Sequence, residues 1–91
     1  MIEKEFEILN HQGLHARPAT ALVNLASKFE SDIFLIRDDK KINAKSILGI
    51  LVLAAEHGSK LKIQVSGVDE AVAAAAIIKL SKDHFGMDEK D

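Results

Sequence analysis

The chain has 91 residues, a length that predicts one small domain over residues 1–91. Its 12 Lys and Arg against 14 Asp and Glu leave a net charge of −2, which argues against a nucleic-acid-binding protein held mainly by bulk charge. Cysteine is absent, so disulfides, thiol catalysis and thiolate zinc sites are excluded. The longest apolar stretches are too short to span a bilayer, and the first residues lack the pattern of a signal peptide. We therefore expect a soluble cytoplasmic protein with no direct membrane insertion.

Strand and helix periodicities alternate along the chain. Apolar residues alternate with glutamates over residues 2–8, and later they recur at helical spacing from Ala19 to Phe29. The remaining elements are a hairpin of strands 33–36 and 41–44 around a polar turn, a short helix from Ser46 to about Leu53 or Ala54, a strand over 60–66, and a helix from Val72 to about His84.

The element order is strand, helix, strand, strand, helix, strand, helix. Three helices can cover only one face of a four-stranded sheet, so the opposite face should be solvated. This agrees with the polar residues that alternate with the apolar set, namely Glu3, Glu5, Glu7, Lys62 and Gln64. The pattern predicts an α+β fold, an open-faced sandwich with a four-stranded antiparallel sheet and three helices on one face.

Cap and turn residues mark the ends of the predicted helices. Ser46 suits the N-cap of the short helix, and Gly58 is expected to mark its exit. Gly67 turns the chain after the fourth strand, and Asp69 is expected to cap the last helix.

The segment from Gly13 to Ala19, GLHARPA, holds the candidate functional residues. Pro18 suits the first turn of a helix, where its missing N–H would have no partner, and this places His15 at or next to the N-cap. A helix N-terminus attracts anions, and its field favours the uncharged, nucleophilic form of imidazole. Arg17 adds a planar, permanently charged group suited to phosphate oxygens. The chemistry favoured here is transient phosphorylation of His15.

Other interpretations of the histidines remain open on spacing alone. A single histidine beside a turn is commonly a polar loop residue. His11 and His15 are four residues apart, but Gly13 separates them and the helix begins only after His15, so we expect no metal site. No strand is followed by a glycine-rich nucleotide loop with a lysine, and no cofactor is expected.

An RNA-binding module is a further alternative, because its element order is similar. Such folds stack bases on aromatic residues of the sheet. This chain has four Phe but no Tyr or Trp, and its presumed open face carries glutamates. We expect no nucleic-acid partner.

The short helix from Ser46 has two apolar sides. Ile50, Leu53 and Ala54 share one side, which the core can bury. The other side comprises Ile47, Leu48, Leu51 and Val52. Such a patch, if exposed, usually marks a partner surface, although a fully buried helix or a strand would show the same pattern.

The whole chain resembles the HPr family, the histidine-containing phosphocarriers of the bacterial phosphoenolpyruvate:sugar phosphotransferase system. The GLHARPA segment is highly specific for this family, and residues 43–49, NAKSILG, resemble its second signature. The resemblance implies a phosphorylated relay intermediate rather than an enzyme. Enzyme I would phosphorylate Nδ1 of His15, with Arg17 and the backbone of Ala16 and Arg17 holding the phosphate. The phosphoryl group would then pass to a sugar-specific IIA component.

The resemblance also implies regulation at Ser46 by the HPr kinase/phosphorylase, and one docking surface shared by the partners. That surface would comprise Ala16, Arg17, Thr20, Ile47, Leu48, Leu51 and Val52. Nothing in the sequence demands more than a monomer, so we expect a monomer. One departure from the family is Gln12, where many relatives carry Ser, Thr or Asn. This difference affects which contacts hold the active-site loop in position. The nitrogen-related regulatory branch of the same relay is an alternative role. A regulatory paralogue in the family lacks the histidine, whereas His15 is present here.

Overall fold

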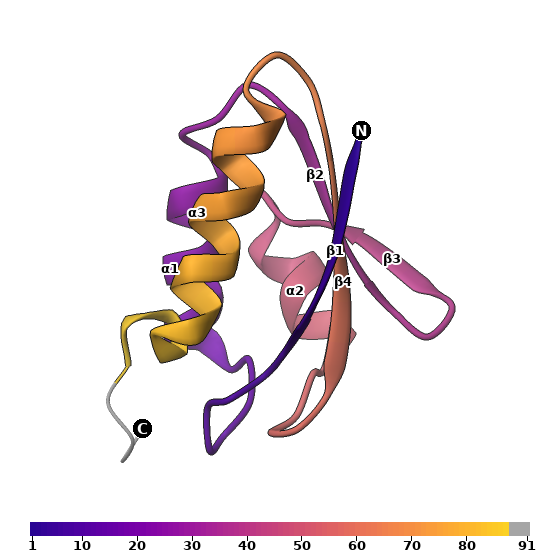
Figure 1. The fold of residues 1–91 in the computed structure, drawn as a ribbon. Helices are drawn as coiled ribbons and strands as arrows, with labels where there is room; N and C mark the ends of the chain where they lie inside the picture. Colours follow the sequence, from indigo (N-terminus) through magenta and orange to yellow (C-terminus); the bar gives the residue numbers. More distant parts are fainter. Residues whose placement is uncertain (88–91) are drawn as a thin grey trace.

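One antiparallel sheet is covered on a single face by the helices (Figure 1). This computed structural model describes residues 1–87. In chain order the elements are β1 (Ile2–Glu7), α1 (Ala16–Ala26), β2 (Asp32–Arg37), β3 (Lys40–Asn43), α2 (Ile47–Leu53), β4 (Lys60–Ser66), α3 (Glu70–Lys82) and a 3₁₀ turn, η1 (His84–Gly86). The predicted element order and the α+β open-faced fold class are confirmed.

The four strands lie in the order β1-β4-β2-β3, and every neighbouring pair is antiparallel. The central strand β4 pairs Leu61 with Phe6 of β1 and Ile63 with Leu35 of β2. These side chains are buried under the helices, whereas Lys62 between them is exposed on the opposite face. The period-2 pattern therefore separates the core from the open face of the sheet.

The helices bury one side each in the same core. The buried helical residues are Ala19, Leu22 and Ala26 of α1, Ile50 and Leu53 of α2, and Ala73, Ala74 and Ile77 of α3. Alanine at the contact positions lets α3 approach the sheet closely. The apolar pattern predicted for the first helix extends beyond its end at Ala26, because Phe29 packs against the core from the following turn. None of the helices in residues 1–87 is long and apolar enough to cross a membrane.

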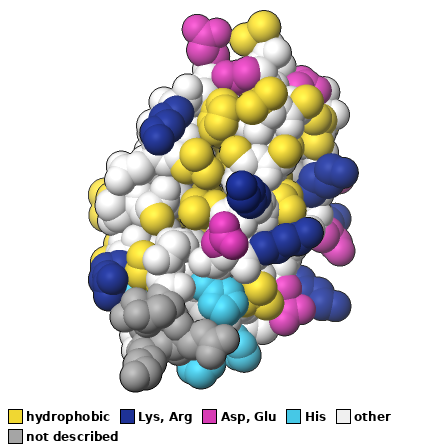
Figure 2. All heavy atoms as spheres, turned by 60° about the vertical axis from the view of Figure 1, so that its left-hand side comes forward, with side chains coloured by type: hydrophobic (Ala, Val, Ile, Leu, Met, Phe, Trp, Pro, Cys, Tyr) yellow, Lys and Arg dark blue, Asp and Glu magenta, His cyan; other side chains and the backbone are white. Residues whose placement is uncertain are grey.

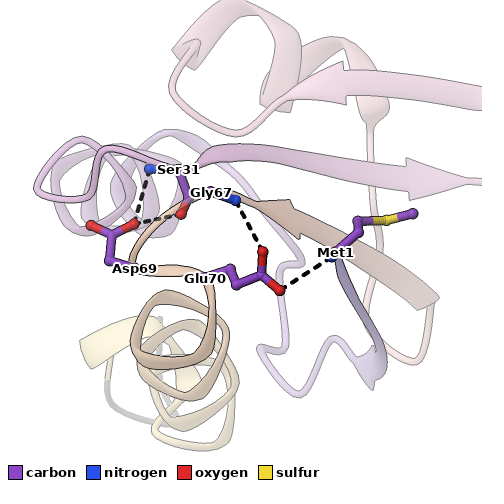
Figure 3. Close-up of polar contacts among 5 residues, drawn as sticks. All are labelled: Met1, Ser31, Gly67, Asp69 and Glu70. Atoms are coloured by element: carbon purple, nitrogen blue, oxygen red, sulfur yellow. Dashed lines mark hydrogen bonds and ion pairs between the residues drawn. The ribbon is translucent and has the colours of Figure 1, made fainter.

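Asp69 occupies the N-cap position of α3, but its carboxylate does not cap the helix. It accepts hydrogen bonds from the N–H of Ser31 at 3.0 Å and from the Ser31 hydroxyl (Figure 3). It also accepts one from the N–H of Glu30 at 2.9 Å. These bonds, that of the Ser31 hydroxyl first, hold the pKa of Asp69 below its usual value. The predicted cap was wrong because the loop before β2 lies within reach of Asp69.

The last helix begins at Glu70, two residues earlier than predicted. The Glu70 side chain forms an ion pair with the N-terminus of the chain. One Glu70 oxygen accepts from the N–H of Gly67 at 3.1 Å, and the other lies 3.2 Å from the Met1 ammonium (Figure 3). Both contacts lower the pKa of Glu70. The partial positive charge at the N-terminus of a helix also favours an acidic side chain in the first turn.

Helix α2 ends at Leu53, as predicted, but Gly58 does not mark its exit. Ala54 takes the left-handed conformation there, with φ of 52°. Arg37 of β2 donates to the carbonyls of Leu53 and Ala54, at 3.0 Å each. Arg37 thus satisfies carbonyl groups that lack partners at a helix C-terminus. Gly58 has φ of 87° in the turn that leads to β4.

Candidate functional site

The loop between β1 and α1 is held against the loop that follows α2. The N–H of Leu14 donates to the carbonyl of Ala55 at 2.9 Å, and Leu14 itself is buried. Gly13 has φ of 72°, and a Cβ on it would lie 2.3 Å from the Ala55 oxygen. Only glycine fits both the backbone conformation and this close approach. These contacts fix the position of the backbone just before His15, which is the residue that precedes α1.

His15 is the N-cap residue of α1, as predicted. Its backbone carbonyl accepts the N–H of Ala19 at 3.0 Å, but its side chain makes no cap hydrogen bond. The ring is half-buried, and its Nε2 is buried without a hydrogen-bond partner. The ring is therefore neither packed away from solvent nor occupied in capping the helix.

The first turn of α1 contains the other predicted residues. Pro18 is its third residue and is buried, in agreement with the prediction from its missing N–H. Ala16 and Arg17 precede it, and both are exposed. Thr20 donates its hydroxyl to the carbonyl of Ala16 at 2.8 Å. The backbone N–H groups of a first turn point out of the helix end, where they can bind an anion.

Helix α2 presents the second predicted group of residues. Its buried side is Ile50 and Leu53, both 0% exposed. Its other side is apolar and exposed, with Leu48 at 76% and Val52 at 64%. Ile47 and Leu51 are also exposed. The predicted core side is confirmed for Ile50 and Leu53, and the predicted surface side is exposed. Ala54, which was expected on the core side, is exposed because it lies at the C-cap, where the chain leaves the helix.

Helices α1 and α2 pack against each other, so the residues predicted from two distant segments lie on neighbouring helices. All the residues predicted to dock partners are exposed, and we keep the name docking surface for this predicted set, which comprises Ala16, Arg17, Thr20, Ile47, Leu48, Leu51 and Val52. A cavity of about 390 Å³ adjoins it on α1, lined in part by Ala16, Arg17 and Thr20. Its remaining lining includes Asn24 and Met87.

Ser46 is the N-cap of α2, and its hydroxyl accepts the N–H of Gly49 at 3.1 Å. The segment before it is also held in place, because Lys45 donates its Nζ to the carbonyl of Phe29 at 2.8 Å. The Lys45 N–H donates to the side chain of Asn43 at 2.8 Å. Ser46 is half-exposed, so a hydroxyl with a structural role also meets solvent beside the docking surface.

Sequence reasoning missed one contact between histidines. The rings of His11 and His57 meet edge to face, with centroids 5.7 Å apart. They come from the loops on either side of the site, and Figure 2 shows histidine side chains gathered on the lower part of one face. Within residues 1–87 no three His, Asp or Glu side chains are grouped to hold a metal ion. No local sequence signal indicates a pair of residues 46 positions apart.

Comparison with known proteins identifies the family. The family model described as PTS HPr component phosphorylation site matches residues 2–83. The chain is 46% identical over 85 residues to the phosphocarrier protein HPr of Treponema pallidum, covering 93% of this chain and 97% of that one.

Solved structures agree with the sequence comparison. An HPr of Thermoanaerobacter tengcongensis, described as HPr-C-His, shares 45% identity with a TM-score of 0.93, over 97% of this chain and 99% of that one. An HPr dimer from the same organism shares 46% identity with a TM-score of 0.77, over 96% of this chain and 100% of that one. The chain belongs to the HPr family of phosphocarriers of the phosphotransferase system.

Proposed function

We propose that this HPr-family chain accepts a phosphoryl group from phospho-enzyme I on His15 and passes it to IIA components. The observation that carries the proposal is the state of the His15 ring at the N-cap of α1. The ring is half-exposed, and its side chain is not used to cap the helix. In the first transfer a P–N bond forms at the His15 imidazole while the bond between the phosphoryl group and enzyme I breaks. In the second transfer the P–N bond at His15 breaks while a bond to the IIA acceptor forms.

The burial of Nε2 supports Nδ1 as the phosphorylated atom. Nε2 has no accessible surface and no hydrogen-bond partner, so an external donor cannot reach it without rotation of the ring. The nucleophilic nitrogen must present a lone pair, which requires the neutral imidazole with its proton on the other nitrogen. Nδ1 would then attack, and Nε2 would keep the proton.

The residues around His15 would hold the transferred group loosely enough to release it. Phosphoryl transfer depends mainly on positioning and on stabilisation of charge. The N–H groups of Ala16 and Arg17 and the Arg17 guanidinium supply charge-assisted donors. The chain itself is then modified in each cycle, as a substrate of its partners rather than as an enzyme.

Ser46 is proposed as the regulatory site of an HPr kinase/phosphorylase. Phosphorylation would add a charge of about −1.5 to −2 at the start of α2, where the helix dipole favours it. The same charge would lie beside Ile47 and Leu48, which are exposed and apolar. The modification would therefore stabilise α2 locally and weaken contacts with enzyme I.

The docking surface is proposed as the common site for enzyme I, IIA components and the kinase. Partners of a carrier must bind and leave quickly, and a small surface of mixed apolar and charged character suits this. We propose that the chain works as a monomer in the cytoplasm. Sedimentation velocity measures the oligomeric state, and a dimer that persists at all concentrations would contradict the proposed monomer.

The test of the carrier role is incubation with enzyme I and phosphoenolpyruvate, followed by intact mass measurement. We expect an acid-labile gain of one phosphoryl group that His15→Ala abolishes. His57→Ala is the matched control, because His57 is an exposed histidine outside the docking surface, and it should retain the gain. Phosphorylation that persists in His15→Ala would refute the proposal.

A panel of purified IIA proteins distinguishes the sugar branch from the nitrogen-related branch. We propose the sugar branch, since the NAKSILG segment around Ser46 resembles that of carriers under kinase control. Preferential transfer to a sugar-specific IIA protein is expected. Transfer confined to a nitrogen-related IIA protein would assign the chain to the regulatory branch.

A further inference from the structure

A groove of about 590 Å³ runs between β1 and α3, away from the docking surface. Its floor is apolar and includes Ile2 of β1 with Ala71, Ala75 and Ile78 of α3. The alanines leave space that larger side chains would fill. The groove follows α3 from Ala71 to Lys82, about 16 Å along the helix, which matches about five residues of extended chain.

The strand beside this groove has a free edge. β1 is the first strand in the order β1-β4-β2-β3 and pairs only with β4. Among the described residues, nothing pairs with its other side. An edge strand presents a row of backbone donors and acceptors that can pair with an added strand.

Three lysines surround the groove. Lys79 and Lys82 lie one turn apart on α3, and Lys4 comes from β1. Lys4 shares its side of β1 with Ile2 and Phe6, so this charge lies on the helix side of the edge strand. All three are exposed, and within residues 1–87 none has a carboxylate partner. Figure 2 shows Lys and Arg side chains beside a broad hydrophobic area on this side of the molecule.

The opposite side of β1 has the reverse charge. Glu3, Glu5 and Glu7 alternate with the inward residues and are exposed on the open face of the sheet. A strand added to β1 would therefore meet lysines on one side and glutamates on the other. This charge pattern specifies the kind of strand that fits.

We propose that the free edge of β1 and this groove bind an extended segment of a partner protein, which adds to the sheet as a fifth strand. Its groove-facing side chains are apolar near Ile2 and acidic near Lys4 and Lys82. Its outward side chains are basic, opposite Glu3 and Glu5. A second copy of this chain is a poor occupant, because two antiparallel β1 strands with their helices on one side would place glutamates against glutamates.

The test uses an acetylated and amidated hexapeptide of sequence KEKEKV, written to pair antiparallel with residues 7 to 2. Added to the ¹⁵N-labelled full chain at millimolar concentration, it should shift the amide signals of β1 and of the groove side of α3. The triple variant Lys4→Glu, Lys79→Glu, Lys82→Glu should weaken binding by about tenfold or more, since the attraction between these lysines and the two groove-facing carboxylates of the peptide becomes repulsion. Ala75→Leu, which fills the floor, should weaken it as well.

Matched controls separate this site from general charge attraction. Lys40→Glu removes a lysine from β3, the other edge strand, and should leave peptide binding unchanged. The peptide KQKQKV keeps the outward lysines but loses the groove-facing carboxylates, and it should bind about tenfold more weakly. Phosphorylation of His15 should be equal in the triple variant and the native chain, so the carrier role is tested separately.

Four results would overturn the proposal. These are the absence of shifts at millimolar peptide, shifts centred on β3 or on the docking surface, equal binding of KQKQKV, and self-association of the native chain that the triple variant abolishes. The last result would assign the groove to a second copy of the chain.

Discussion

Two replacements of Ser46 should separate its effect on stability from its effect on phosphotransfer. In Ser46→Ala the N–H of Gly49 loses the hydroxyl that accepts its hydrogen bond at 3.1 Å. Loss of an N-cap of this kind costs about 0.5–2 kcal/mol, typically about 1 kcal/mol. In a chain of this size, about 1 kcal/mol lowers the melting temperature by roughly 4–8 °C.

Ser46→Asp should keep the cap, because aspartate caps helices about as well as serine does. Its charge at the positive end of α2 adds about 0.3–1 kcal/mol, with the lower value favoured by the half-exposed position. We therefore expect Ser46→Asp to be as stable as the native chain or slightly more stable, and Ser46→Ala to be the least stable of the three.

Transfer from enzyme I should follow a different order. Ser46→Ala leaves the docking surface uncharged near Ile47 and Leu48, so its transfer rate should stay close to native. Ser46→Asp places a carboxylate beside these side chains, where contact with a partner would desolvate it. We expect a rate lower by about tenfold, which corresponds to about 1.4 kcal/mol of lost partner binding.

The assays are urea unfolding with thermal melting, and the initial rate of His15 phosphorylation by enzyme I. Val68→Asp is the matched control, because it adds the same charge at an exposed position in the loop before α3 and should leave the rate unchanged. Equal transfer rates for Ser46→Asp and the native chain would refute the reasoning about the docking surface. Equal destabilisation by Ala and Asp would refute the role of Ser46 as a cap.

Three further predictions concern stability and docking. Ala54→Gly should raise the free energy of unfolding by about 1 kcal/mol in urea titrations, since the left-handed conformation strains alanine, and no gain would contradict that strain. Leu48→Ala should change stability by less than about 0.5 kcal/mol yet slow transfer from enzyme I, whereas Ile50→Ala should cost about 2–5 kcal/mol, and unaltered transfer in Leu48→Ala would exclude Leu48 from docking. Because the pKa of Asp69 is lowered in the folded chain, its carboxylate stabilises the fold at a pH above its usual pKa of about 4. This stabilisation is lost as the pH falls through the lowered pKa of the folded chain. Asp69→Asn should therefore show a smaller fall in unfolding free energy from pH 5 to pH 2, and an unchanged slope would contradict the prediction.

Several features of the site followed from local patterns in the sequence. Pro18 indicated the start of α1, and this placed His15 at its N-cap. The spacing of Ile50 and Leu53 identified the buried side of α2 and left Leu48 for the surface. Such predictions succeed because helix periodicity and N-terminal preferences depend on residues within one or two turns.

The errors at the predicted cap of α3 and at the exit of α2 both involve contacts between distant segments. Asp69 was expected to cap its own helix, but its carboxylate binds the backbone of Glu30 and Ser31, almost forty residues away. The end of α2 at Leu53 was predicted, but Gly58 was expected to mark the exit from the helix, whereas Ala54 takes the left-handed conformation there and Arg37 binds its carbonyl. A cap or helix end depends on which other segment comes close enough to supply a partner.

The amino-acid order thus determined the succession of strands and helices, the core side of each, and the place of His15 at a helix N-terminus. Only the tertiary structure decided that Gly13 lies against Ala55, that Phe85 enters the core beside Phe6, and that the edge of β1 leaves a groove against α3. Periodicity is a property of neighbouring residues and can be read along the chain. The distances between separate segments arise only when the whole sheet and its helices pack together.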